Sequence, residues 1–68
     1  MDMVSVSSSN IASIGYEEGT LYVRFLSGDL YAYYGVPNSV YDGLMSAPSH
    51  CSYLAKHVKN IYQYNKLS

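Results

Sequence analysis

Pro37 separates two parts of the chain whose apolar residues recur with different periods. Before Pro37, apolar and polar residues alternate, which is the two-residue period of a half-buried strand. After Pro37, the apolar residues recur at intervals of three and four, which is the period of a helix. Proline lacks the amide hydrogen of a sheet ladder, but its fixed φ suits the first turn of a helix. The sequence therefore predicts a sheet followed by helices.

Three strands are predicted in the first part, over residues 10–16, 20–26 and 30–36. Gly19 can adopt the left-handed conformation that a three-residue hairpin loop over residues 17–19 requires. The Ser-Gly-Asp sequence at residues 27–29 is typical of a second turn. A three-stranded antiparallel meander is the expected result.

The alternation assigns the side chains of each strand to opposite faces of the sheet. The first two strands each have an apolar face, and these faces are expected to carry Ala12, Ile14, Tyr16, Leu21, Val23 and Phe25. Arg24 lies on the other face of the second strand. On the third strand, Tyr31 and Tyr33 share one face, opposite Leu30 and Ala32.

Two helices are predicted in the second part. The first covers residues 37–47, although Gly43 costs about 1 kcal/mol relative to alanine in a helix interior, so packing must stabilise it. Pro48 ends this helix, and Ser49 or Ser52 can cap the second. The apolar stripe of the second helix is Leu54, Val58, Ile61 and Tyr62. The fold class is α+β, with the order β-β-β-α-α and both helices packed on one face of the sheet.

The bulk properties of the chain limit its partners. Its 68 residues accommodate one core, and its net charge of −1 lacks the basic excess that favours long duplex nucleic acid. No apolar run approaches the roughly 20 residues of a membrane helix, and residues 1–4 lack the pattern of a signal peptide. We therefore expect a cytoplasmic protein without a membrane partner. The single cysteine, Cys51, cannot form an internal disulfide. A small chain without such a crosslink gains stability by association with other copies, so we expect a homo-oligomer.

Several short segments in a fixed order resemble a known family. They are Ser8-Ser9-Asn10-Ile11, Leu21-Tyr22-Val23-Arg24-Phe25, Ser27-Gly28, Tyr31-Ala32-Tyr33, Gly35-Val36-Pro37, Val40-Tyr41, Leu44-Met45 and Ala47-Pro48-Ser49. With this spacing the chain resembles the KTSC domain, which occurs at the C-terminus of some lysyl-tRNA synthetases and as free-standing bacterial and phage proteins. The sequence departs from the family pattern in the last helix, at Cys51, residues 53–55 and residues 58–59.

The resemblance implies a small α+β domain of unassigned biochemistry, for which attachment to a synthetase suggests RNA binding. We expect one KTSC-like domain over residues 8–64, a flexible N-terminal segment over residues 1–7 and a C-terminal tail over residues 65–68. Fold alone does not determine function, which depends on the residues of each candidate site.

Catalysis is the first candidate, because His50, Cys51 and His57 are a possible nucleophile and base. Adjacent helix residues point in different directions, and no residue is available to orient the base. The three residues also lack the paired spacing of a structural zinc site. We therefore expect no catalysis, no metal and no cofactor, with Cys51 as a small packed thiol.

Tyr31 and Tyr33 are the second candidate, because rings at alternate strand positions can stack on a nucleotide base. Arg24 on the neighbouring strand is expected to join them and contact a phosphate. The alternative is that helices cover these rings and make them part of the core, and for one of the two rings we favour that alternative.

The start of the second helix is the third candidate, because its free amides and positive dipole end attract anions. The predicted ligand-binding residues are Arg24, Tyr31, Tyr33, Ser49, His50, Tyr53, Lys56 and His57. The predicted function is a non-catalytic, homo-oligomeric module that binds a phosphate-bearing small molecule or nucleotide, such as a phage protein that sequesters a host nucleotide signal. An accessory domain that binds single-stranded RNA is the alternative, and a protein-interaction module is the third possibility.

Overall fold

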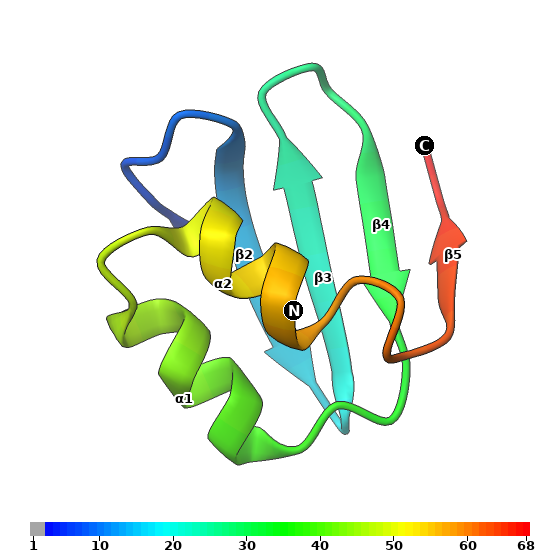
Figure 1. Ribbon diagram of the computed structural model, residues 1–68. Coiled ribbons are helices and arrows are strands. Elements are labelled where there is room, and N and C mark those ends of the chain that lie inside the picture. The colour runs from blue at the N-terminus through cyan, green and yellow to red at the C-terminus, as the bar shows by residue number, and fades with distance from the viewer. Residues whose placement is uncertain (1–2) are drawn as a thin grey trace.

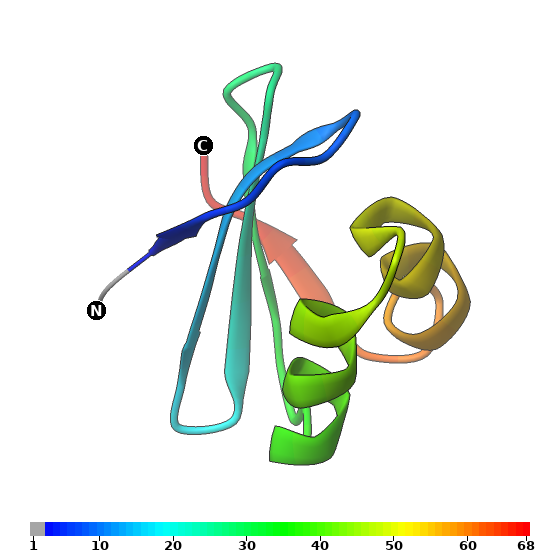
Figure 2. The ribbon, with the colours of Figure 1, turned by 90° about the vertical axis from the view of Figure 1, so that its left-hand side faces the viewer.

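The alternating segment before Pro37 forms three strands of an antiparallel sheet, and the segment after it forms two helices that cover one face of that sheet (Figures 1 and 2). The computed structural model describes residues 3–68. The elements in chain order are β1 (Val4–Ser5), β2 (Ile11–Glu17), β3 (Thr20–Phe25), β4 (Leu30–Tyr33), α1 (Asn38–Ser46), α2 (His50–His57) and β5 (Tyr64–Lys66). The α+β class and the antiparallel sheet followed by two helices are confirmed, but the sheet has five strands rather than three.

The two additional strands are the short outer strands β1 and β5, which lie where a flexible segment and a tail were expected. β1 pairs with β2 through Val4 and Ile14, and β5 pairs with β4 through Lys66 and Tyr31. All residues of both strands are exposed, so the sequence lacks the alternation of apolar and polar residues that would predict them. Their backbone hydrogen bonds to a neighbouring strand define them instead. Met1 and Asp2, which belong to the segment expected to be flexible, lie outside the described residues.

The hairpin between β2 and β3 is tighter than the three-residue loop that the sequence predicts. Glu17 pairs with Thr20, so only Glu18 and Gly19 form the loop. Both have positive φ, at 50° and 79°. This is the pattern of a two-residue type I′ turn, whose twist matches that of the flanking strands.

A register shift in β2 corrects the expected inward face of that strand. The shift lies between Ile11 and Ser13, and it places Ile11 opposite Phe25. Ile11 and Ile14 are consequently both fully buried, whereas Ala12, expected on the inward face, is half-buried. An extra residue in one strand of an antiparallel pair interrupts the alternation in this way.

The core lies between the sheet and the two helices. Its buried residues are Ile11, Ile14, Leu21, Val23, Tyr33, Val36, Leu44, Leu54 and Val58. The helices approach each other closely at Gly43, where a Cβ atom would overlap the phenol of Tyr53. This contact explains why α1 contains a glycine at an interior position.

α2 is shorter than the sequence predicts, and this corrects its apolar stripe. It ends at His57, and Asn60 adopts a left-handed conformation with a φ of 65°, which turns the chain towards β5. The cap residue Val58 has already left helical geometry, with a φ of −126° and a ψ of −53°. Ile61, predicted in the stripe, is therefore 59% exposed. Neither helix of residues 3–68 is long and apolar enough to cross a membrane.

Candidate functional site

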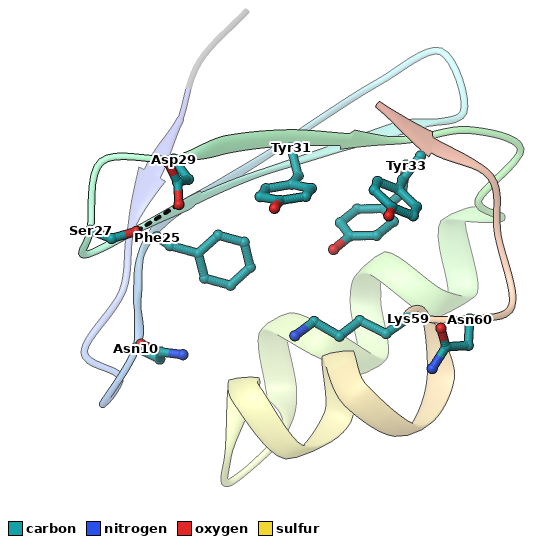
Figure 3. Close-up of a pocket in the computed structure, with 9 residues that line it drawn as sticks. Asn10, Phe25, Ser27, Asp29, Tyr31, Tyr33, Lys59 and Asn60 are labelled. Atoms are coloured by element: carbon teal, nitrogen blue, oxygen red, sulfur yellow. Dashed lines mark hydrogen bonds between the residues drawn. The ribbon is translucent and has the colours of Figure 1, made fainter. Parts of the chain in front are cut away.

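A pocket of about 390 Å³ opens between the helix-covered face of the sheet and the segment that follows α2 (Figure 3). Its aromatic lining residues are Phe25, Tyr31, Tyr33 and Tyr64. Its polar lining residues are Asn10, Ser27, Asp29, Lys59 and Asn60. We call this the aromatic pocket. Its volume lies in the range of small-molecule sites, roughly 300–1,000 Å³.

Strand pairing brings the four rings of the aromatic pocket to one face. Tyr31 lies opposite Val23 and Tyr33 lies opposite Leu21, so both tyrosines share the helix-covered face of the sheet. The Tyr31 and Tyr33 rings are stacked with centroids 6.3 Å apart, and the Phe25 ring meets Tyr31 edge-on at 5.5 Å. Tyr64 on β5 contacts both tyrosine rings, at 5.7 and 6.0 Å. The rings therefore form one continuous apolar surface.

The two tyrosines of β4 differ in burial. Tyr33 is 2% exposed, whereas Tyr31 is half-buried. Burial raises the pKa of the Tyr33 phenol, and the nearby phenols of Tyr31 and Tyr64 raise it further. The Tyr33 hydroxyl therefore keeps its proton at neutral pH and is available as a hydrogen-bond donor. One ring of the pair is core and the other is accessible, which is the division that the sequence favours.

The charged groups of the aromatic pocket come from opposite walls. Lys59, in the segment after α2, extends across the pocket towards Phe25, and its ammonium lies 5.8 Å from the centre of the Phe25 ring (Figure 3). This separation is within the range of a cation–π contact. Asp29 lies on the sheet wall, where Ser27 Oγ donates to its Oδ2 at 3.1 Å and Lys66 Nζ lies 3.6 Å from its Oδ1. Asp29–Lys66 is the only ion pair among residues 3–68, so no carboxylate neutralises Lys59.

Arg24 does not join the tyrosines, which corrects the sequence-based prediction. It lies opposite Leu30, one position away from the Val23–Tyr31 pair, and adjacent residues of a strand face opposite sides of the sheet. Its guanidinium donates instead to the backbone oxygen of Gly28 at 2.9 Å. Arg24 thus stabilises the β3–β4 turn on the far face.

The residues predicted at the start of α2 lie outside the aromatic pocket. Ser49 Oγ accepts a hydrogen bond from the Ser52 amide at 3.2 Å, and the His50 ring nitrogen Nδ1 lies 2.8 Å from the Leu44 oxygen. Lys56 and His57 are in the last turn, about 9 Å along the axis from His50 at 1.5 Å per residue. Lys56 and His57 are therefore at the opposite end of the helix from its free amides.

Tyr53, also predicted to bind ligand, packs between the two helices. Its phenol lies against Gly43, and its ring centroid is 4.3 Å from that of His57. These contacts assign Tyr53 to helix packing.

Cys51 faces the segment that precedes β2. Its Sγ atom lies 3.3 Å from Ser8 Oγ and 3.9 Å from Ser9 Oγ. The hydrogen bond with Ser8 lowers the thiol pKa more than burial raises it, and Ser9 and the backbone of Asn10 and Ile11 lower it further. His50 and His57, the two histidines considered as its base, contact Leu44 and Tyr53 instead. Residues 3–68 contain no cluster of three or more His, Cys, Asp or Glu side chains that could hold a metal ion.

Sequence reasoning identified Tyr31 and Tyr33 but missed most of the remaining lining of the aromatic pocket. The sequence predicts Phe25 on the apolar face of its strand. It does not give the strand register that brings this face next to the tyrosines. Lys59 and Tyr64 enter the pocket only because α2 ends early and β5 pairs with β4. No local sequence signal specifies that long-range pairing.

The chain is similar to a known domain family and to proteins of three organisms. Residues 7–64 match the KTSC domain family. An uncharacterised protein of Stutzerimonas stutzeri (strain A1501) is 37% identical over 65 residues, which cover 93% of this chain and 86% of the relative. A protein of Tsukamurella paurometabola is 45% identical over 49 residues, which cover 69% of this chain and 73% of the relative. The crystal structure of a KTSC domain protein from Yersinia pestis matches with a TM-score of 0.93 and 32% identity, over 98% of this chain and 97% of that chain.

Proposed function

This chain belongs to the KTSC domain family, and we propose that it is a non-catalytic module that binds a small phosphate-bearing aromatic molecule, a nucleotide, in the aromatic pocket. One observation carries the proposal: a single pocket combines four aromatic rings with a lysine that has no carboxylate partner. Aromatic side chains stack on nucleotide bases, at about 1–3 kcal/mol per base. A lysine ammonium is a compact point charge for phosphate.

The free lysine of the aromatic pocket favours an anionic ligand over a cationic one, since the Asp29 carboxylate on the other wall is already paired with Lys66. Aromatic side chains can also enclose a quaternary ammonium group. Here, however, the Lys59 ammonium already lies over the Phe25 ring, and it would repel a second cation. The neutral Tyr33 hydroxyl adds a hydrogen-bond donor, which suits an anion or a base carbonyl.

The charge of the whole chain favours a compact anion over a long polyanion. The chain contains four lysine and arginine residues and has a net charge of −1. Arg24 lies on the far face of the sheet, and Lys66 pairs with Asp29. Few cations therefore remain for successive phosphates of an RNA strand, whose binding depends on several such contacts.

Calorimetric titration with the four common ribonucleoside 5′-monophosphates tests this proposal. We expect at least one of them to bind, and we expect Tyr31→Leu to lower its affinity by about tenfold or more through the loss of stacking. Tyr22→Leu is the matched control, because Tyr22 lies on the other face of the sheet and its replacement should leave affinity unchanged. Lys59→Gln should weaken binding of the monophosphate but not of the uncharged nucleoside, whereas Lys56→Gln should change neither.

Salt dependence separates this proposal from the RNA alternative. Affinity for a single-stranded RNA should fall with salt with a log-log slope of about 0.7 per phosphate contact, whereas affinity for a single nucleotide should fall much less. Tight RNA binding with a steep slope, without mononucleotide binding, would replace our proposal. Absence of binding to either ligand would favour the protein-interaction role.

A further inference from the structure

We infer that the aromatic pocket selects ribonucleotides over deoxyribonucleotides, with the ribose diol on the Asp29 carboxylate and the 5′-phosphate on the Lys59 ammonium. This inference rests on the proposed function and names the class of nucleotide. It follows from the charges that the two walls of the pocket present.

The Asp29 carboxylate is held in a defined orientation at the pocket wall. Ser27 Oγ donates to Oδ2 at 3.1 Å, and Lys66 Nζ lies 3.6 Å from Oδ1. The side chain is 43% exposed, so its remaining acceptor positions are accessible. An ionised carboxylate only accepts hydrogen bonds. A ligand group that contacts Asp29 must therefore be a hydrogen-bond donor, which a hydroxyl group is and an ionised phosphate is not.

Asp29 and Lys59 lie on different walls, and the rings of Tyr31 and Tyr33 line the same cavity (Figure 3). In a ribonucleoside 5′-phosphate, the 2′,3′-diol and the phosphate are carried on different sides of the ribose. One such ligand can therefore present hydroxyl donors to Asp29 and negative charge to Lys59 while its base covers the tyrosines. A carboxylate that accepts from a ribose hydroxyl is an established solution in dinucleotide-binding folds.

The test compares each ribonucleoside 5′-monophosphate that binds with its 2′-deoxy form, by calorimetry on the full chain. We expect the ribonucleotide to bind about tenfold or more tightly, since a hydrogen bond to a charged group is among the stronger ones. Asp29→Asn should bring the ratio of the two affinities close to one. Lys59→Gln should weaken both ligands by the same factor and preserve the ratio. Asp42→Asn, at an exposed carboxylate on α1, is the matched control and should leave the ratio unchanged.

Failure of the diol assignment and failure of the proposed function give different results. Equal affinity for the two forms in the wild-type chain, together with the loss of binding in Tyr31→Leu, would overturn the assignment of the diol to Asp29 and leave the proposed function intact. Absence of binding by all four ribonucleotides would overturn both. If Asp29→Asn unfolds, as thermal denaturation would reveal, the wild-type comparison of 2′-deoxy and 3′-deoxy forms still decides, because loss of either hydroxyl should weaken binding.

Discussion

Tyr33 contributes its ring to the core and its hydroxyl to the aromatic pocket. Burial raises the phenol pKa, with further contributions from Tyr31 and Tyr64. In the unfolded chain the pKa returns to about 10. The folded state therefore binds the phenolic proton more tightly than the unfolded state. This contribution to stability is fully present below the unfolded pKa and is lost as the pH rises through the folded pKa.

A Tyr33→Phe variant tests this linkage, because phenylalanine cannot ionise. We expect its free energy of unfolding to fall less than that of the wild type between about pH 8 and pH 11, the range that brackets the phenol pKa of an unfolded chain. Urea denaturation at a series of pH values measures the free energy of unfolding of both proteins. The difference between the two proteins at about pH 8 corrects for the loss of the hydroxyl itself. Parallel curves for the two proteins would contradict the assigned pKa shift.

The contact of Gly43 with Tyr53 joins α1 to α2. Alanine is normally favoured over glycine in a helix interior by about 1 kcal/mol. At Gly43, however, the added methyl group would overlap the Tyr53 phenol and displace it. The two positions should therefore be strongly coupled.

A double-mutant cycle measures that coupling. We expect Gly43→Ala to give no gain in the wild-type background, because helix propensity is offset by the displaced phenol. In a Tyr53→Ala background we expect the same substitution to raise the free energy of unfolding by about 1 kcal/mol. Urea denaturation of the four proteins provides the values. An equal gain in both backgrounds would show that the helices do not meet at these residues.

At the level of elements, the sequence predicts the strands and helices whose buried residues recur at a regular interval. The alternation before Pro37 and the helical spacing after it correctly predicted three strands, two helices and their order. β1 and β5 were missed because they are short and exposed, and their stability comes from backbone pairing. The end of α2 is not predicted correctly, because the chain leaves helical geometry at Val58 although the apolar pattern continues to Tyr62.

The residues of the candidate site were predictable where a local apolar pattern places them, and not where strand pairing does. Alternation placed Tyr31 and Tyr33 on one face, and this prediction is correct. Arg24 was assigned to their side although strand register places it on the other. Lys59 and Tyr64 could not be assigned, because their positions depend on a strand pairing distant in sequence.

At the level of the whole molecule, both helices cover the same face of the sheet and leave the other without a helix (Figure 2). Tyr22 and Leu30 are half-buried on that face, and Leu26, just beyond β3, is 61% exposed. We propose that copies of the chain associate through this face, since a small chain without crosslinks gains buried apolar area in this way.

Size-exclusion chromatography with light scattering tests this association. We expect a mass above the 7.6 kDa of one chain, and we expect a Tyr22→Ser variant to shift the protein towards the monomer. Lys56→Ser, at an exposed position on the helix side of the molecule, is the control and should not change the mass. A monomer at high micromolar concentration would remove the proposal.

Amide chemical shifts of the ¹⁵N-labelled chain locate a bound ligand residue by residue, and we expect them to place it in the aromatic pocket. During titration with the ribonucleoside 5′-monophosphates, we predict saturable shifts that cluster at Tyr31, Lys59, Asn60 and Tyr64. We predict no such cluster at the start of α2, over residues 49–53. Shifts concentrated at the start of α2, or no saturable shifts with any of the four nucleotides, would show that the aromatic pocket is not a nucleotide site.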